Sequence, residues 1–159
     1  MLYGVRKVTV NRRMKIFITG VAGFLGSHLA DLMLSQGHTV AGNDNMIGGY
    51  TDNVPQDVQF HQVDCCDLEN MTKAMEGCDI VYHTAATAYE GLSVFSPVLV
   101  TRNIFEASVT TITAAIRNKV KRIVYCSSMA RYGHHDVMPY KEDYECRPQD
   151  PYGIAKKAG

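Results

Sequence analysis

The sequence contains no tryptophan, no net charge and no long hydrophobic run. Its 16 lysine and arginine residues balance 16 aspartate and glutamate residues, so no basic surface is expected to hold a nucleic-acid backbone. No apolar stretch reaches ten residues, whereas a membrane-spanning helix needs about 20. These absences lead us to predict a protein that binds neither nucleic acid nor a membrane.

Cysteine is present without the spacing of a metal site or of a disulfide framework. The five cysteines are an odd number, Cys65 and Cys66 are adjacent, and no CxxC pair occurs. We therefore predict no metal site, and reduced thiols that pack as small hydrophobic groups. Reduced thiols are typical of a cytoplasmic protein. The adjacent His134 and His135 lack partners at ligand spacing and are expected in a solvated loop.

The first 13 residues are polar and basic, and they lack the apolar segment of a secretory signal. We predict a flexible lead over residues 1–13, with Met14 as an alternative start of the protein. One domain follows over residues 14–159, where the apolar content is sufficient for a substantial core.

Apolar strands and helical segments alternate along this domain. Strands are predicted over 14–19, 39–43, 58–63, 79–84 and 121–127, and helices over 24–36, 68–76, 97–118 and from 151 onward. The strand segments are apolar on both faces, which is typical of a parallel sheet covered by helices on each side. The candidate buried stripe of the long helix consists of Ile104, Ser108, Ile112, Ala115 and Ile116.

A glycine-rich turn joins the first strand to the first helix. Gly20, Gly23 and Gly26 stand three apart. In such a turn the first glycine permits the tight bend, the second a close approach to a pyrophosphate, and the third close packing of helix and sheet. The N–H groups of Phe24 and Leu25 lie at a helix N-terminus, which favours an anion. The turn indicates dinucleotide binding, although a generic strand-to-helix turn has the same spacing.

Asp44 ends the second strand, 24 residues after Gly20. A carboxylate at this place accepts both ribose hydroxyls of adenosine and repels a 2′-phosphate, which favours NAD over NADP. An ordinary turn aspartate is the alternative reading. Together with the glycine turn, Asp44 leads us to predict an α/β fold. It is a Rossmann-type doubly wound parallel sheet of about five strands, in the order 3-2-1-4-5.

Tyr152 and Lys156 stand four residues apart at the start of the last helix. Such residues share a helix face, and a lysine cation beside a tyrosine lowers the pKa of the phenol. The tyrosine can then act as an acid or base toward a substrate hydroxyl. Ser128 follows the fifth strand, at the sheet edge where such folds hold ligands. A pair on an exposed helix surface is the alternative.

With these residues together, residues 14–159 resemble the extended short-chain dehydrogenase/reductase family, in its NAD-dependent epimerase/dehydratase branch. The family's TGxxGFxG matches residues 19–26, and its PYGxxK matches residues 151–156. Its Asp-Asn pair matches Asp44 and Asn45, and its adenine-binding aspartate matches Asp64, beside Cys65. Its HxAA block matches residues 83–86, and its SS…YG block matches residues 127–133.

The resemblance implies a role for each matched residue. Tyr152 would be the acid/base, Lys156 its partner and a ligand of the nicotinamide ribose, and Ser128 the contact for a substrate hydroxyl. It also implies NAD as cofactor, and a nucleotide-diphosphate sugar, converted through a transient keto-sugar, as substrate of the full-length protein. The residues expected to bind the cofactor are Gly20, Gly23, Phe24, Leu25, Gly26, Asp44, Asn45, Asp64, Cys65, Thr84, Ala85, Ala86, Tyr152 and Lys156.

The match leaves the reaction type open. Met129 and Ala130 follow Ser128 where the family's 4,6-dehydratases carry Asp-Glu, so dehydration is not expected, whereas epimerase, reductase and decarboxylase remain alternatives. Asn103 stands about one residue from the family's helix asparagine and is left out of the predicted site.

Family members continue beyond the tyrosine helix. Residues 14–159 are therefore expected to be an NAD(P)-binding Rossmann domain truncated before its last strands and the substrate domain. The alternative is an NAD-binding module, or a truncated protein, without catalytic turnover. The family often forms homodimers through the long helix and the tyrosine helix, so a homodimer is one option here.

Overall fold

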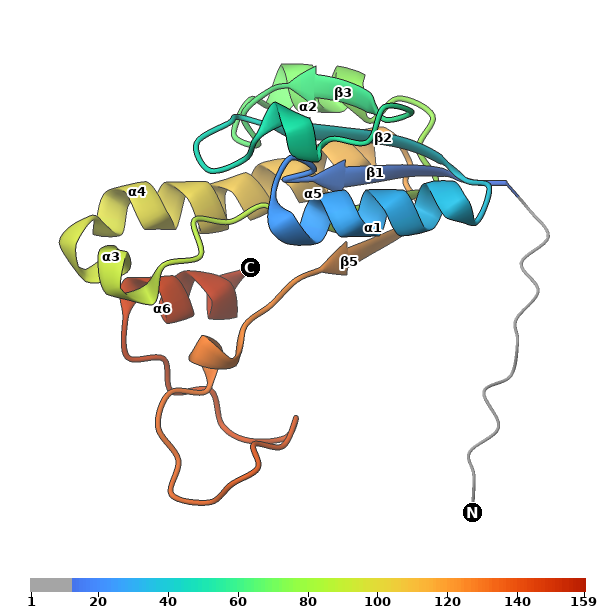
Figure 1. Ribbon diagram of the computed structural model, residues 1–159. Coiled ribbons are helices and arrows are strands. Elements are labelled where there is room, and N and C mark those ends of the chain that lie inside the picture. The colour runs from blue at the N-terminus through green and yellow to red at the C-terminus, as the bar shows by residue number, and fades with distance from the viewer. Residues whose placement is uncertain (1–12) are drawn as a thin grey trace, which may run out of the picture.

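Five parallel strands form the centre of the structure (Figure 1). The computed structural model describes residues 13–159, so the predicted lead lies outside the described residues except for its last one. The strands run in the order β3-β2-β1-β4-β5, which confirms the predicted topology. They are β1 (Lys15–Thr19), β2 (Thr39–Asp44), β3 (Gln59–Gln62), β4 (Ile80–His83) and β5 (Arg122–Tyr125).

Helices lie on both faces of the sheet. Helix α1 (Phe24–Ser35) covers one face, while α2 (Leu68–Ala74) and α5 (Ala107–Arg117) cover the other (Figure 1). The remaining helices are α3 (Glu90–Phe95), α4 (Pro97–Thr101), the π-helix η2 (Arg102–Glu106) and α6 (Pro151–Ala158). Two short 3₁₀ turns, η1 (Thr51–Asn53) and η3 (Met129–Arg131), lie in the connections.

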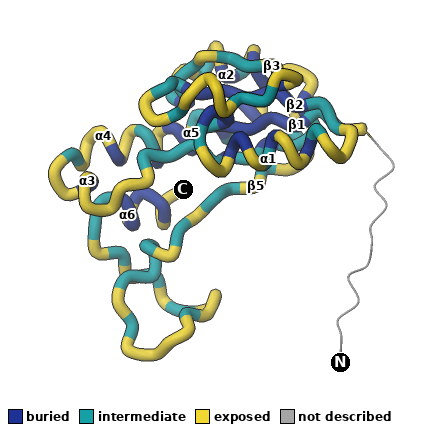
Figure 2. The backbone as a smooth tube through the Cα atoms, in the orientation of Figure 1, coloured by how far each residue is buried: buried dark blue, intermediate teal, exposed yellow. Residues whose placement is uncertain are grey.

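The side chains of β1 divide the core into two layers. Ile16 and Ile18 pack with Met33 of α1 on one face of the sheet. Phe17 points to the other face and packs with Met71 of α2. Alternate residues of a strand point to opposite faces, so the apolar middle of β1 is buried on both sides of the sheet (Figure 2). The outer strands β3 and β5 carry half-buried and exposed residues because each has only one neighbouring strand.

Three features of the helices differ from the sequence prediction. Helix α3 was not predicted, and the long helix over 97–117 is interrupted by the π turn. In α5 the buried positions include Thr111, whereas Ile112 is half-buried and Ile116 is 69% exposed. Helix α5 lies close against α2 and the sheet, so small side chains face inward and the larger isoleucines lie at the margin.

Helix α1 also buries a narrower stripe than its leucines indicate. Its buried residues are Gly26, Ser27, Ala30 and Met33, whereas Leu25 and Leu32 are about half exposed. None of the helices within residues 13–159 combines the length and the apolar character that crossing a bilayer requires.

Candidate functional site

A cavity of about 610 Å³ opens at the carboxyl ends of the strands. The segments that follow all five strands contribute to its wall, and α6 completes it. Ligands of doubly wound sheets bind at this edge. Every residue predicted to bind the cofactor lines this one cavity: Gly20, Gly23, Phe24, Leu25, Gly26, Asp44, Asn45, Asp64, Cys65, Thr84, Ala85, Ala86, Tyr152 and Lys156.

The glycine turn brings three segments of backbone into close contact. Gly20 has a φ of +70°, and a Cβ added to it would lie 2.9 Å from the Cα of Ala85. A Cβ added to Gly26 would lie 2.2 Å from the carbonyl oxygen of Gly20, so only glycine fits at either place. Gly23 precedes α1 and has no side chain to cap it. The first-turn N–H groups therefore remain available at the cavity wall, where an anion is favoured.

The carboxylate of Asp44 is buried at the end of β2. Its Oδ2 accepts the N–H of Ala22 at 3.2 Å, and its Oδ1 accepts the N–H of Met46 at 2.8 Å. Because each carboxylate oxygen has two lone pairs, one acceptor site remains on each oxygen. This pair of free acceptors matches the two hydroxyls of a ribose. An uncapped helix N-terminus and a carboxylate at this spacing fit an adenosine diphosphate group.

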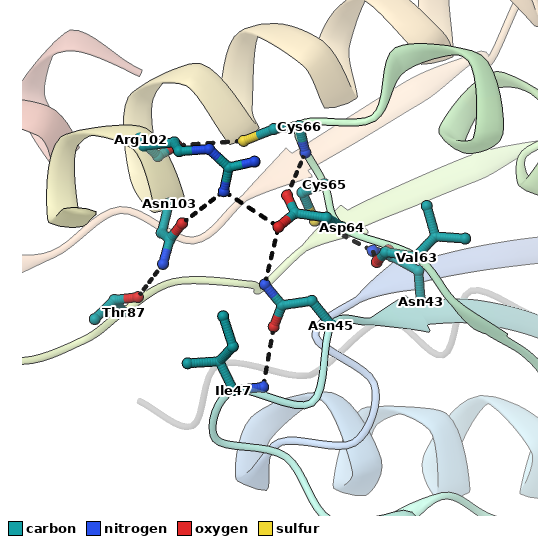
Figure 3. Close-up of polar contacts among 10 residues, drawn as sticks. All are labelled: Asn43, Asn45, Ile47, Val63, Asp64, Cys65, Cys66, Thr87, Arg102 and Asn103. Atoms are coloured by element: carbon teal, nitrogen blue, oxygen red, sulfur yellow. Dashed lines mark hydrogen bonds and ion pairs between the residues drawn. The ribbon is translucent and has the colours of Figure 1, made fainter. Parts of the chain in front are cut away.

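Asp64 lies in the loop after β3, where it receives several hydrogen bonds (Figure 3). The N–H of Cys66 donates to its Oδ1 at 2.8 Å, while the Asn45 amide and the Arg102 guanidinium each donate to its Oδ2 at 3.2 Å. Partial burial alone would raise the pKa of this carboxyl, but the hydrogen bonds and the Arg102 charge outweigh burial and lower it. Asp64 is therefore held as a carboxylate.

Cys65 is buried beside Asp64. The Asn43 side chain donates to its sulfur at 3.3 Å. Burial raises the pKa of the Cys65 thiol to about 11. The thiol therefore remains protonated at neutral pH, so it contributes packing and shape to the cavity wall rather than a nucleophile.

Thr19 and His83 join the ends of β1 and β4 under the cavity floor. The Thr19 hydroxyl accepts the N–H groups of Thr84 and Ala85, each at 3.1 Å, so its proton is directed to Nδ1 of His83 at 2.8 Å. Nε2 of His83 then carries the ring proton and faces the Ser108 oxygen at 3.1 Å. Burial, with the nearby Lys156 charge, lowers the pKa of His83 to about 4. His83 therefore positions the backbone of Thr84 and Ala85 as a neutral group.

Tyr152 and Lys156 are both buried on the inner face of α6. The Asp150 side chain accepts the N–H of Gly153 at 2.7 Å and starts the helix. Nζ of Lys156 donates to the carbonyl of Cys126 at 2.7 Å, and lies 5.2 Å from the ring centroid of Tyr125. Burial lowers the pKa of Lys156. Figure 2 shows both buried and exposed positions along α6.

Ser128 is the one predicted site residue that the cavity wall does not include. Its hydroxyl accepts the N–H of Ala130 at 3.2 Å and caps η3, whereas the neighbouring Ser127 lines the cavity. The sequence prediction also omitted Asn103, which lines the cavity and donates to the Thr87 hydroxyl at 2.9 Å. The only sequence signal for Asn103 was its place one residue from the family's helix asparagine. Within residues 13–159, no group of three or more metal-ligating side chains gathers.

The chain is similar in sequence to a family of known proteins. The family model described as "NAD dependent epimerase/dehydratase family" matches residues 16–159. A probable UDP-arabinose 4-epimerase of Arabidopsis thaliana is 35% identical over 153 residues, and the UDP-glucose 4-epimerase of Corynebacterium glutamicum is 33% identical over 143 residues. These matches cover 89% and 90% of this chain, but 37% and 44% of those proteins.

Solved structures of proteins with the same kind of name are also similar to this chain. The UDP-glucose 4-epimerase of Thermotoga maritima with UDP-glucose superposes with a TM-score of 0.88 at 31% identity. That of Thermus thermophilus, in complex with NAD, superposes with a TM-score of 0.86 at 34% identity. Each match covers 91% of this chain and 48% of the solved chain. The chain thus spans less than half the length of these relatives.

Proposed function

Because the chain belongs to the NAD-dependent epimerase/dehydratase family, we propose that residues 14–159 form an NAD-binding domain. The observation that carries this proposal is the single cavity at the carboxyl edge of the sheet, since every predicted cofactor residue lines it. The first turn of α1 would hold the pyrophosphate, Asp44 the adenosine ribose and Asp64 the adenine. Tyr152 and Lys156 would flank the nicotinamide ribose.

We propose that the full-length protein is a 4-epimerase of UDP-sugars, as its relatives' names indicate for them. When bound, NAD supplies the oxidant for a sugar carbinol. Tyr152 would hold and return the hydroxyl proton, while the Lys156 cation would stabilise the tyrosinate. The backbone after β5 would orient the same hydroxyl through Ser127 or Ser128. Epimerisation is assigned to the whole protein because the chain matches less than half of the relatives' length.

We further propose that the protein forms a homodimer in the cytoplasm. The outer side of the long helix exposes Phe105, Val109 and Ile116, and their spacing places them along one side of the helix. The five cysteines are all free, which supports a reducing compartment.

Isothermal titration of the chain with NAD and NADP tests the binding proposal. We expect binding of NAD and at least about tenfold weaker binding of NADP, because Asp44 repels the 2′-phosphate. Asp44→Asn keeps the shape and removes the charge, so the preference for NAD should fall to about twofold or less. The matched control is Asp52→Asn, an exposed position in η1 of the same connection. The absence of any heat signal with NAD at millimolar concentration would contradict the proposal.

Tyr152→Phe tests the proposed chemistry in the full-length protein. We expect 4-epimerisation of UDP-glucose, followed by NMR of the sugar protons, to fall by about 100-fold or more, because the acid/base is lost. NAD affinity should fall by much less than the rate, because phenylalanine keeps the ring and loses only the hydroxyl. Tyr140→Phe is the control, because the Tyr140 hydroxyl only donates to the Gly133 carbonyl and does not line the cavity. Retained epimerisation in Tyr152→Phe would exclude the assigned role.

A further inference from the structure

Two consecutive residues of the π-helix η2 reach the loops around the cavity (Figure 3). The Arg102 guanidinium donates to Oδ2 of Asp64 and to Oδ1 of Asn103, both at 3.2 Å. Asn103 in turn donates to the Thr87 hydroxyl at 2.9 Å. With the Asn45 amide on the other side of Asp64, these bonds form a continuous polar chain from the loop after β2 to the loop after β4.

The π turn explains why both neighbours contribute. Successive side chains of an α-helix diverge by about 100°, so they seldom serve the same site. A π turn contains an extra residue and is found frequently at functional sites. Here the Arg102 carbonyl accepts the N–H of Ala107 within the helix and the thiol of Cys66 at 3.5 Å. Arg102 is therefore held to the loop after β3 by its backbone as well as by its side chain.

The Asp64–Arg102 ion pair has little value for stability. The two side chains are 31% and 43% exposed, and exposed pairs contribute little net free energy. Its effect on the hydrogen bonding of Asp64 is larger. Arg102 and Asn45 together occupy Oδ2, and the Cys66 N–H occupies one lone pair of Oδ1. The second lone pair of Oδ1 is then the acceptor left for a ligand.

We propose that Arg102 is a positioning residue of the adenine subsite, which orients Asp64 so that one carboxylate acceptor meets the 6-amino group of adenine. The proposal rests on the proposed binding of NAD. It extends the cofactor site to the π turn, and assigns Arg102 a part in base selection. A 6-oxo purine presents an acceptor at that place and opposes the Asp64 oxygen, so the site should prefer NAD to its hypoxanthine analogue.

The experiment is titration of the chain with NAD and with nicotinamide hypoxanthine dinucleotide. The wild-type chain is expected to prefer NAD about tenfold, the effect of one hydrogen bond gained and one repulsion avoided. In Arg102→Ala the preference should fall to about twofold. Arg102→Lys should restore part of it, because lysine keeps the charge but lacks the planar fork. Asp64→Asn should abolish the preference, and adding Arg102→Ala to it should change nothing more.

Arg117→Ala is the matched control. Arg117 lies on the same long helix and pairs with Glu69 at 2.9 Å with a similar exposure of 46%, but away from the cavity. It should leave both affinities unchanged. A second readout is the pH dependence of NAD binding: losing Arg102 lets the pKa of Asp64 rise, so affinity should begin to fall at a higher pH on acidification.

Two outcomes overturn the inference in distinguishable ways. If Arg102→Ala and Arg102→Lys both bind NAD with the full wild-type preference, Arg102 has no part in base selection and the NAD proposal stands. If the wild-type chain binds neither dinucleotide, the proposed function fails and the inference fails with it. Circular dichroism of each variant shows whether the fold is retained, and Arg102→Lys serves as the test if Arg102→Ala does not fold.

Discussion

His83 shows how closely a single residue's surroundings determine its protonation. Its side chain is 2% exposed, and both ring nitrogens have partners, Thr19 and Ser108. A charged imidazole needs two acceptors, but the Thr19 oxygen already accepts two N–H groups and is left only with a proton to donate. Burial and this arrangement both favour the neutral ring. The Thr19 hydroxyl therefore positions the backbone of Thr84 and Ala85 and also fixes the tautomer of His83.

His83 should make the stability of the chain depend on pH. Its folded pKa of about 4 lies below the ordinary value of 6.5, so on acidification the unfolded chain takes up the proton first. Stability is fully present above about pH 6.5 and is lost as pH falls toward 4. Between about pH 7 and pH 5, urea unfolding should show a loss of up to about 2 kcal/mol from this group.

His83→Gln carries no titrating group and should remove that part of the pH dependence, even if it is less stable overall. His134→Gln is the control, because His134 is 76% exposed and should leave the dependence as it is. A His83→Gln chain with the wild-type dependence on pH would contradict the assignment.

At the scale of residues, the sequence predicted the cavity wall because each motif combines a residue type with a place at the end of a strand. Gly20 and Asp44 are examples, and parallel strands bring their carboxyl ends to one edge. The partners of Asp64 could not be predicted, because Arg102 lies 38 positions away on a helix whose register the π turn changes. Which of Ser127 and Ser128 lines the cavity depends on the direction of the backbone after β5, and the residue types alone do not determine that direction.

At the scale of elements, the strand positions followed from apolar runs, and the strand order followed from the glycine turn and Asp44, which are typical of a Rossmann-type sheet. Helices α1, α2 and α6 were also predicted, whereas α3 and the π turn were not. Helix α3 has only six residues, too few for a periodic pattern to stand out. The π turn lies where Asn103 stands about one residue out of step with the family's pattern. A π turn contains one extra residue, and the apolar pattern of the sequence does not predict where it occurs. In α5 the choice of buried face was set by the close approach of α2, a tertiary contact.

The contact between the glycine turn and α1 should be sensitive to one methyl group. In Gly26→Ala the added carbon would lie 2.2 Å from the Gly20 carbonyl oxygen, a backbone atom that cannot move alone. We expect a loss of about 3 kcal/mol or more in urea unfolding, and weakened NAD binding because α1 must shift. Gly91→Ala in α3 is the control, since nothing lies within 4 Å of its added carbon.

Gly91→Ala should be neutral or stabilising by up to about 1 kcal/mol, the usual gain from replacing a helical glycine. If Gly26→Ala were equally well tolerated, with unchanged NAD affinity, the helix would not need its close approach to the sheet.

At the scale of the whole molecule, the cavity is a product of topology. Five segments far apart in the sequence meet there because every strand runs in the same direction. Helix α6 closes the cavity by packing Tyr152 and Ala155 against Val100 and Ile104 of the long helix. The long helix therefore faces the cavity and α6 on one side, while its other side exposes Phe105, Val109 and Ile116. A partner on the outer side would stiffen the wall of the site.

The proposed homodimer predicts a particular response to charge on that outer side. Sedimentation equilibrium of the chain should give a mass of about twice the monomer's 17.6 kDa at micromolar concentrations. Val109→Glu should shift the equilibrium toward the monomer by about tenfold or more, because burying an unpaired carboxylate is costly. Leu32→Glu on α1 is the matched control, since Leu32 is 49% exposed and Val109 is 48% exposed. A wild-type chain that stays monomeric, or dimers equally weakened by both variants, would contradict pairing through the long helix.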